Sequence, residues 1–372
     1  MSGTAGPYRL LLTGGGTGGH LFPAVATAEE FRRQMPDTEV LFVGTKRKMD
    51  GTALAAHGFS GDSIVCLGLK GKSPMALLKA AAVLPLSFLQ AGRILRRFRP
   101  HVVLGVGGYV TGPVVAMARL MNIPTLIHEQ NSVPGLANRQ LGRLVHRVCL
   151  SLPDSETFFA KSKTVFTGNP VRRDILRLAR AAEQRAGEGK TVLVLGGSQG
   201  ARAINRLLPE AVAALDQPLR ERLSIIHQTG ADDYPVVNER YRQLGLAAEV
   251  APFFTDMAAV YARADLLVSR AGATTLAELA VLGKPAILIP FPQAADNHQE
   301  KNAEYYRRGG GALLLRQADT DAVTLAGAMG GLLGDQRRLT AMGEAMRRLA
   351  LPDAAEKIVA CCLELIKRGS DV

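Results

Sequence analysis

The same local pattern occurs twice in this chain: an apolar strand, a glycine-rich turn and an alanine-rich helix. The first copy is YRLLLTGGGTGGHLFPAVATAEEF, with its strand over Tyr8–Leu12 and its helix over Pro23–Phe31. The second is TVLVLGGSQGARAINRLLPEAV, with its strand over Thr191–Leu195. Glycine lets the backbone turn sharply and leaves N–H groups exposed at a helix start, where an anion can bind. The repeated pattern therefore predicts two Rossmann-like halves, each with an anion-binding turn.

Further apolar segments recur about every 20 to 30 residues, with helical patterns between them. The expected strands are Tyr8–Leu12, Glu39–Gly44, His101–Val106, Pro124–His128, Val145–Leu150 and Lys163–Thr167, followed by Thr191–Leu195, Leu223–Gln228, Glu249–Phe253, Asp265–Ser269, Pro285–Ile289 and Ala312–Leu315. Alternation of strand and helix is typical of α/β proteins with parallel sheets. A composition that is 47% hydrophobic fits parallel strands buried on both faces.

The length of the chain and one turn suggest the domain organisation. At 372 residues the chain is longer than one hydrophobic core usually supports. The turn Gly168-Asn169-Pro170 is followed by a charged segment that extends to Lys190. We expect a first domain over 1–168 and a second over 169–352. Because ligands of such sheets bind beyond the carboxyl ends of the strands, the expected site is a cleft that both domains face.

The first glycine-rich turn does not by itself identify a ligand. Gly14, Gly16 and Gly19 satisfy the G-x-G-x-x-G dinucleotide fingerprint, but no acidic residue follows the second strand, which ends in TKRK. A basic end suits a 2′-phosphate, so an NADP-dependent oxidoreductase stays open. Glycines that only allow close helix packing are another explanation. His20 is the titratable side chain of the turn, and it either faces the ligand or packs locally. No Gly-Lys-Ser/Thr follows, which excludes a P-loop.

Polar side chains follow several predicted strands of the second half. The turn around Ser198 offers N–H groups and a hydroxyl at a helix start. Glu278 lies in the first turns of a helix beginning near Thr274, where a carboxylate can accept two ribose hydroxyls or simply favour the helix N-terminus. Arg172 could hold a diphosphate, although a solvated linker is the simpler explanation. The segment PFPQAADNHQEKNAEYY carries groups that suit sugar hydroxyls or an ordinary capped helix start.

The net charge of +12 is concentrated in the first half, where residues 63–153 contain eleven basic side chains and one acidic side chain, Glu129. A basic surface of this kind attracts nucleic acid or an anionic membrane. The alternative is an ordinary solvated surface whose excess of basic residues arose by chance. Nucleic-acid binding should come with stacking aromatics or a known module, and neither is found. Segment 72–99 mixes leucines with cations, as membrane-surface segments do, although several leucines could face the core. Pro85 is expected to divide this segment into two pieces.

Other classes of protein are excluded by what the sequence lacks. The N-terminus shows no secretory signal pattern, and no stretch reaches the ~18 apolar residues that a membrane-spanning helix needs. Neither the cysteines nor the seven histidines have metal-ligand spacing, and no C-x-x-C motif occurs. The four cysteines are interpreted as reduced thiols of a cytosolic protein: Cys66, Cys149, Cys361 and Cys362.

Taken together, the motifs resemble the MurG family of bacterial UDP-N-acetylglucosamine:undecaprenyl-diphospho-muramoyl-pentapeptide N-acetylglucosamine transferases. The matching motifs, in order over nearly the whole chain, are GGGTGGHLFP, GVGGYVTGPVVAMARLMNIPTLIHEQNSVPGLANR, TGNPVR, GGSQGARAIN, SRAGATTLAEL and PFPQAADNHQEKNA. The resemblance implies a GT-B fold with the donor site mainly in the second domain, and a C-terminal helix, 353–369, that packs back on the first. It also implies inverting transfer of N-acetylglucosamine to the 4-hydroxyl of lipid I, which gives lipid II in peptidoglycan synthesis, cell shape and cell division.

The resemblance assigns roles to individual residues. His20 would be the catalytic base or an acceptor-side positioning group, and Asn131 would sit at the acceptor side. Arg172 and Ser198 would contact the donor diphosphate, and Glu278 the ribose. Some members carry Gln-Gln where this chain has His298-Gln299, so the sugar contact is assigned to Gln299. The substrate-binding set is Thr17, Gly18, Gly19, Asn131, Arg172, Ser198, Phe254 (near the uracil), Glu278, Gln299 and Asn302. The membrane-contact set is Lys72, Lys79, Leu86, Phe88, Arg93 and Arg96.

The same resemblance defines the expected partners. They are UDP-N-acetylglucosamine, lipid I, the anionic surface at the cytoplasmic face of the inner membrane, and other cell-wall synthesis proteins. No cofactor and no obligatory metal are expected, because helix-end N–H groups and Arg172 can stabilise the leaving diphosphate. The alternatives that remain are a transferase acting on another lipid such as diacylglycerol, a UDP-N-acetylglucosamine epimerase, the NADP-dependent oxidoreductase and a nucleic-acid-binding protein.

Overall fold

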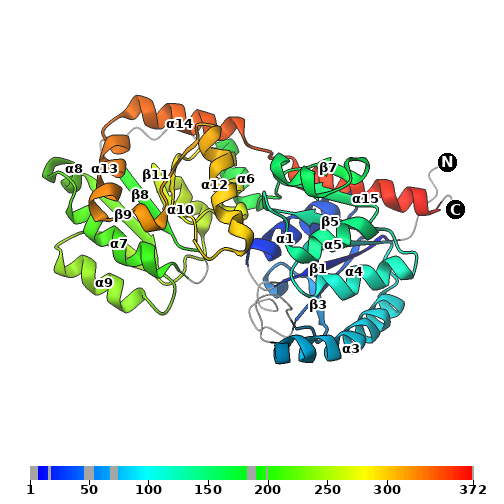
Figure 1. The fold of residues 1–372 in the computed structure, drawn as a ribbon. Helices are drawn as coiled ribbons and strands as arrows, with labels where there is room; N and C mark the ends of the chain where they lie inside the picture. The colour runs from blue at the N-terminus through cyan, green and yellow to red at the C-terminus, as the bar shows by residue number, and fades with distance from the viewer. Residues whose placement is uncertain are drawn as a thin grey trace. The chain divides into compact units, whose positions relative to one another are not determined.

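The computed structural model describes residues 7–15, 18–45, 54–67, 74–181, 190–197 and 200–370. The chain separates into two units (Figure 1). Unit 1 contains Met1–Arg172 and Pro352–Val372, and unit 2 contains Arg173–Leu351. The first segment of unit 1 therefore ends at residue 172, whereas the sequence places the end of the first domain at 168.

Unit 1 is built on a parallel sheet of seven strands in the order β3-β2-β1-β4-β5-β6-β7. The strands are β1 (Arg9–Gly14), β2 (Glu39–Gly44), β3 (Ser60–Ser63), β4 (Val102–Gly107), β5 (Thr125–Glu129), β6 (Arg147–Leu150) and β7 (Thr164–Phe166). All six strands expected in this half are present, with their ends shifted by a few residues. β3 was not predicted, because its sequence SGDS has no apolar pattern. It is a strand through its pairing with β2 at the sheet edge.

Helices cover both faces of this sheet (Figure 1). One face packs against α1 (Gly18–Gln34) and α15 (Ala354–Ser370), and the other against α3 (Pro74–Phe98), α4 (Thr111–Leu120) and α5 (Leu136–Leu144). Successive side chains of a strand point to opposite faces of the sheet, so one strand contributes residues to both cores. Leu10 and Leu12 of β1 enter the first core, and Leu11 enters the second. The C-terminal helix α15 lies against α1 of unit 1.

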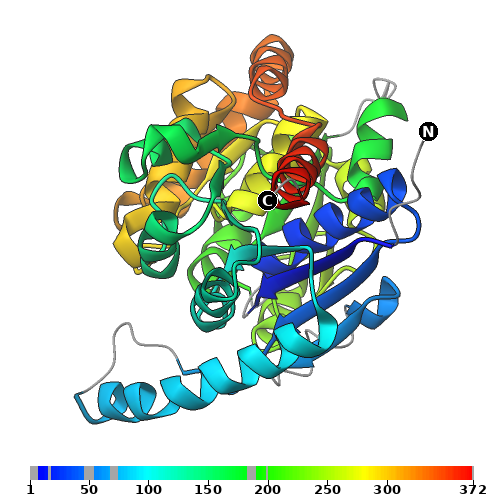
Figure 2. The same ribbon diagram turned by 90° about the vertical axis from the view of Figure 1, so that its right-hand side faces the viewer.

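The expectation that Pro85 divides segment 72–99 is wrong. The helix α3 continues through Pro85 as one element and is the long cyan helix of Figure 2. Pro85 lacks the N–H of a regular helix, but its ring lies on the exposed face, where water can satisfy the carbonyl one turn earlier. Ser87 anchors the helix just beyond, because its hydroxyl donates to Val65 O at 2.6 Å. Burial of Ile94 and Leu95 holds the second half of α3 on the sheet.

Unit 2 repeats the architecture with six parallel strands in the order β10-β9-β8-β11-β12-β13. They are β8 (Lys190–Leu195), β9 (Leu223–Gln228), β10 (Ala248–Ala251), β11 (Leu266–Ser269), β12 (Ala286–Leu288) and β13 (Ala312–Leu314). The helices are α6 (Arg173–Ala181), α7 (Arg202–Ala213), α8 (Gln217–Glu221), α9 (Tyr234–Gln243), α10 (Met257–Arg263), α11 (Ala273–Leu282), α12 (His298–Arg308), α13 (Ala322–Leu333) and α14 (Gln336–Arg348). All six strands expected here are found.

The strand order reverses between β1 and β4 in unit 1, and between β8 and β11 in unit 2. At such a switch point the connections leave in opposite directions, which opens a crevice at the carboxyl ends of the strands. Each glycine-rich turn follows the strand at the switch point, β1 or β8. The two turns predicted to bind anions therefore occupy the position where doubly wound sheets bind ligands.

Candidate active site

His20 lies in the first turn of α1, because this helix begins at Gly18 and not at Pro23 as expected. Two neighbours restrict its half-buried ring. The ring nitrogen Nδ1 is 3.2 Å from Oε1 of Gln130. The ring also lies against Gly107, where an added Cβ would lie 3.0 Å from Cε1 and 3.1 Å from Nδ1. Gly107 has φ of 103°, which also requires glycine. The backbone of Gly107 and the side chain of Gln130 together define the orientation of the His20 imidazole.

The loop between β5 and α5 is held by a buried carboxylate. Glu129 accepts hydrogen bonds from the backbone N–H of Asn131 at 3.0 Å and of Gly135 at 3.2 Å. It also accepts from the side-chain amides of Asn131 and Asn138, at 3.2 and 2.9 Å. Burial raises the pKa of Glu129, and these hydrogen bonds oppose the shift. Glu129 thus orders the loop that carries the predicted residue Asn131, whose amide contacts this carboxylate.

His128 is a second, fully buried histidine behind His20. Its Nε2 lies 3.0 Å from Gly168 O and 2.9 Å from the Ser151 hydroxyl, and its Nδ1 lies 3.1 Å from Nε2 of Gln130. Burial lowers the pKa of His128 to about 4, so the ring is neutral at pH 7. Neither Gln130 nor His128 was predicted as a site residue from the sequence. The signal available in the sequence was their position at the carboxyl end of the expected strand Pro124–His128.

Arg172 is half-buried and does not belong to a solvated linker. Its guanidinium lies 5.0 Å from the centre of the Phe22 ring, a cation–π distance. Phe22 belongs to the first turns of α1, as His20 does. The structure therefore brings Arg172 to the helix that begins at the glycine-rich turn of unit 1.

Glu278 lies in α11, whose start follows β11 directly. Its side chain is buried, with 4% of the residue surface exposed. The hydroxyl of Tyr261 on α10 donates to Oε2 of Glu278 at 2.8 Å. A carboxylate that only stabilises a helix N-terminus can do so while exposed to solvent, so that role does not require burial. Burying a carboxylate costs free energy, and the burial of Glu278 near the switch point is therefore not explained by the helix terminus alone.

Two further predicted residues lie on α12. Asn302 is fully buried and donates to Ala271 O at 3.2 Å, which joins α12 to the loop after β11. Gln299 accepts from the backbone N–H of Phe291 at 3.0 Å, which joins α12 to the loop after β12. His298, which was not assigned to the sugar, contacts Ala295 O with Nδ1 at 2.8 Å. The structure thus places Gln299 and Asn302 beside the loops that follow the central strands.

Arg270 was missed as an individual residue by sequence analysis, although it is the charged group that connects these loops. The guanidinium is buried and donates to Ile289 O and Pro290 O, both at 2.9 Å. It also donates to Gln317 Oε1 at 2.7 Å. Burial lowers the pKa of Arg270 to about 10, so it stays charged at pH 7. An arginine directly after a buried strand, in SRAG, was the available signal.

Phe254 lies in the loop after β10 and is tied to the second glycine-rich turn through Gln228. The backbone N–H of Phe254 donates to Oε1 of Gln228 at 3.0 Å, and Nε2 of Gln228 donates to Gly197 O at 3.3 Å. Gly200 closes the turn: it has φ of 77°, and an added Cβ would lie 1.8 Å from Thr229 O. The sequence predicted Phe254 as a neighbour of the uracil, but its link to this turn through Gln228 was not predicted.

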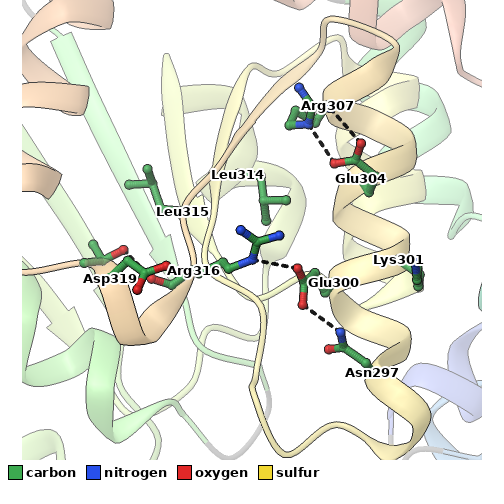
Figure 3. Close-up of a pocket in the computed structure, with 10 residues that line it drawn as sticks. Asn297, Glu300, Lys301, Glu304, Arg307, Leu314, Leu315, Arg316 and Asp319 are labelled. Carbon is green, nitrogen blue, oxygen red and sulfur yellow. Dashed lines mark hydrogen bonds and ion pairs between the residues drawn. The ribbon is translucent and has the colours of Figure 1, made fainter.

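A separate cavity of about 620 Å³ lies on another face of α12 (Figure 3). Its lining charges pair with one another: Arg316 with Glu300 at 2.8 Å, and Arg307 with Glu304 at 2.7 Å. The lining consists of Asn297, Glu300, Lys301, Glu304, Arg307, Leu314, Leu315, Arg316, Asp319 and Thr320. The predicted donor residues described in unit 2, namely Phe254, Glu278, Gln299 and Asn302, do not line it. We therefore do not assign this cavity to the donor.

Several predicted site residues lie outside the described residues: Thr17, Ser198 and Lys72. Lys79 belongs to α3, but its side chain is also outside the described part, and Gly18 and Gly19 begin α1. Of the membrane-contact set, Arg93 and Arg96 are exposed, Leu86 is exposed and Phe88 is half-buried. Within the described ranges, no cluster of His, Cys, Asp or Glu could hold a metal ion. No helix in that part of the chain is long and apolar enough to cross a membrane.

Comparisons with known proteins agree with this architecture. Residues 10–150 match the glycosyltransferase family 28 N-terminal domain, and residues 191–358 match the C-terminal domain of the same family. A UDP-N-acetylglucosamine–N-acetylmuramyl-(pentapeptide) pyrophosphoryl-undecaprenol N-acetylglucosamine transferase of Desulfotalea psychrophila is 59% identical over 97% of both chains. The protein of the same name from Geobacter sulfurreducens is 44% identical over 94% of this chain and 97% of that one.

Solved structures agree as well. Acinetobacter baumannii MurG superimposes with a TM-score of 0.76 at 33% identity, covering 96% of this chain and all of that one. A UDP-GlcNAc 2-epimerase from Neisseria meningitidis has a TM-score of 0.66 at 15% identity, over 96% of this chain and all of that one, and shows a common fold alone. The predicted GT-B fold of two parallel-sheet domains is confirmed. With both halves matched and relatives of this similarity, the chain belongs to glycosyltransferase family 28 and is a glycosyltransferase.

Proposed function

We propose that the protein transfers N-acetylglucosamine from UDP-N-acetylglucosamine to the 4-hydroxyl of the muramoyl sugar of lipid I, with inversion, and so forms lipid II. The observation that carries this proposal is the 59% identity to one such transferase along 97% of both chains. Because that similarity includes both units, it supports the acceptor as well as the donor. A shared fold would support neither.

The donor is assigned mainly to residues that follow the strands of unit 2. Glu278 accepts ribose hydroxyls, which its two oxygens can do while one also accepts from Tyr261. Gln299 and Asn302 bind the sugar, and the uracil lies near Phe254. Arg172 and Ser198 bind the diphosphate, together with the N–H groups of Gly18 and Gly19 at the first glycine-rich turn.

The reaction is a displacement at the anomeric carbon. The 4-hydroxyl oxygen forms the new glycosidic bond from the face opposite the diphosphate, and the bond between the anomeric carbon and the diphosphate oxygen breaks. His20 accepts the hydroxyl proton, for which an imidazole has a suitable ordinary pKa. The negative charge that develops on UDP is stabilised by Arg172 and by helix-end N–H groups. Asn131 lies at the acceptor side, on the loop ordered by Glu129.

Transfer of radiolabelled N-acetylglucosamine to a short-chain lipid I analogue tests this function. We expect labelled product with lipid I, none with diacylglycerol, and no conversion of UDP-N-acetylglucosamine to its 2-epimer when lipid I is absent. Product with diacylglycerol instead would keep the donor and replace the acceptor. Epimer without transfer would contradict the transferase assignment.

We also propose that α3 binds the anionic surface of the cytoplasmic membrane. Its exposed side includes Leu86 and Leu89, which are 45% and 62% exposed, next to Arg93 and Arg96. Apolar side chains beside cations suit the acyl boundary and the headgroups respectively. The predicted contacts Lys72, Lys79 and Phe88 extend the same segment.

Reversing the charge of Lys72, Lys79, Arg93 and Arg96 to glutamate should weaken binding to anionic vesicles by tenfold or more. Each cation near such a surface contributes about 1 kcal/mol. Co-sedimentation with vesicles containing anionic and zwitterionic lipids measures this. The matched control reverses four exposed arginines of unit 2: Arg222, Arg337, Arg338 and Arg348. Equal binding by the two quadruple variants would remove α3 from the membrane contact.

A further inference from the structure

A chain of hydrogen bonds runs from His20 into the interior of unit 1. His20 Nδ1 lies 3.2 Å from Gln130 Oε1, and Gln130 Nε2 lies 3.1 Å from His128 Nδ1. His128 Nε2 in turn lies 3.0 Å from Gly168 O. Gln130 and His128 are 2% and 0% exposed, so water does not compete for these bonds. The bonds therefore determine which atoms carry hydrogen.

The orientation of the Gln130 amide follows from its contact with β4. Its Nε2 lies 3.0 Å from Val106 O, and a carbonyl oxygen can only accept a hydrogen bond. The amide nitrogen must therefore face Val106, which leaves Oε1 facing His20. The reverse orientation would place two acceptors against each other at this contact.

The tautomer of His128 is determined in the same way at the other end. Gly168 O can only accept, so His128 Nε2 carries the hydrogen. Because burial lowers the pKa of His128 to about 4, the ring is neutral at pH 7 and Nδ1 has a lone pair. That lone pair accepts the second N–H of Gln130, which also lies near His128 O, with Nε2 at 3.3 Å from that oxygen. Both N–H groups of the Gln130 amide are thus engaged by groups that cannot rearrange.

The remaining contact is between Gln130 and His20. Oε1 of Gln130 can only accept, so Nδ1 of His20 must donate, and the neutral His20 ring then has its lone pair on Nε2. We infer that Gln130, backed by His128, is a positioning residue that holds His20 in the Nδ1–H tautomer with Nε2 as the proton acceptor. This inference rests on the proposed function for its purpose. Its structural content, the tautomer, can be measured independently of activity.

The direct test is the ring-nitrogen NMR spectrum of the full chain labelled with ¹⁵N-histidine, at a pH where His20 is neutral. Seven histidines contribute signals, and the pair from His20 is the one missing in His20→Asn. We expect a protonated Nδ1 and an unprotonated Nε2. An Nε2–H tautomer, or rapid averaging between the two tautomers, would overturn the inference even if the chain transfers N-acetylglucosamine. If the wild-type chain shows the expected tautomer but does not transfer N-acetylglucosamine, the proposed function is contradicted and the inference about the tautomer is not.

Two substitutions separate positioning from a merely structural role of Gln130. Gln130→Leu removes the acceptor for His20 and should lower kcat about tenfold, as expected for loss of one neutral hydrogen bond, and the tautomer should average. Gln130→Glu retains an acceptor but loses both donors. It should retain the Nδ1–H tautomer and more kcat than the leucine variant, with the acidic limb of the pH–rate profile at higher pH, because a carboxylate favours imidazolium.

The matched control is Ser151→Ala, which removes a buried contact to His128 that does not involve Gln130. Gly168 O remains as the acceptor there, so the His20 signals should not change. Thermal unfolding of each variant establishes that it is folded. If the two Gln130 variants lose the same activity and both keep the wild-type His20 signals, then the amide only supports the loop through Val106 O, and the inference fails.

Discussion

Replacing His20 with alanine should lower kcat for N-acetylglucosamine transfer by about 10²- to 10⁴-fold, the usual contribution of a general base. The Michaelis constant for the donor should change little, since the imidazole acts on the acceptor hydroxyl. The residual activity should no longer show the acidic limb of the pH–rate profile, because that limb reports protonation of the base. Steady-state rates with a lipid I analogue at several pH values measure both effects.

The matched control for this variant is His57→Ala. His57 is a surface histidine of the same unit, paired with Glu29 at 2.8 Å. It should retain wild-type transfer. A decrease in kcat below tenfold for His20→Ala, with the pH limb unchanged, would show that another group accepts the proton. A large increase in the donor Michaelis constant at constant kcat would move His20 to donor binding.

Replacing Glu278 with alanine should raise the Michaelis constant for UDP-N-acetylglucosamine on the order of a hundredfold. Removing one partner of a buried, hydrogen-bonded charged contact typically costs about 2–5 kcal/mol, which corresponds to tens- to thousands-fold. The same variant should lose discrimination between the donor and its 2′-deoxyribose analogue, because the carboxylate is proposed to accept from ribose hydroxyls. Transfer rates with both donors, and calorimetric titration with UDP, measure these changes.

Tyr261→Phe is the control for Glu278, because it removes the 2.8 Å hydrogen bond but keeps the carboxylate. It should lower the free energy of unfolding by about 1 kcal/mol and leave ribose discrimination intact. Equal effects of the two substitutions on the donor Michaelis constant would reduce Glu278 to a structural partner of Tyr261. Retained discrimination in Glu278→Ala would place the ribose elsewhere.

Much of the architecture could be predicted from local sequence. All twelve expected strands are found within a few residues of their predicted bounds, and most of them contain apolar residues that are buried in a sheet. The strand expected at Glu249–Phe253, for example, shifts to Ala248–Ala251. The position of the glycine-rich turns after β1 and β8 followed from the same reading. Local sequence is sufficient for these features because the residues of a buried parallel strand must be apolar. The residues of an anion-binding turn at the start of a helix must be small for the same kind of local reason.

The local reading did not predict elements that depend on their neighbours. β3 has a polar sequence and is a strand only because β2 offers an unpaired edge. α3 passes through Pro85 because its later residues, including Ile94 and Leu95, are buried against the sheet. In both cases tertiary contacts outweigh intrinsic preference, which is worth only a fraction of the packing energy.

The sequence by itself determined the two α/β halves, the glycine-rich turns and the residue types available for chemistry, including His20, Glu278 and Asn302. Only the tertiary structure decided which of them are connected. His20 and Gln130 are 110 positions apart, and they meet because β1, β4 and β5 are neighbours in the sheet. Hydrophobic periodicity is a local property that a sequence displays, whereas hydrogen bonds between strand ends depend on strand order, which sheet pairing sets.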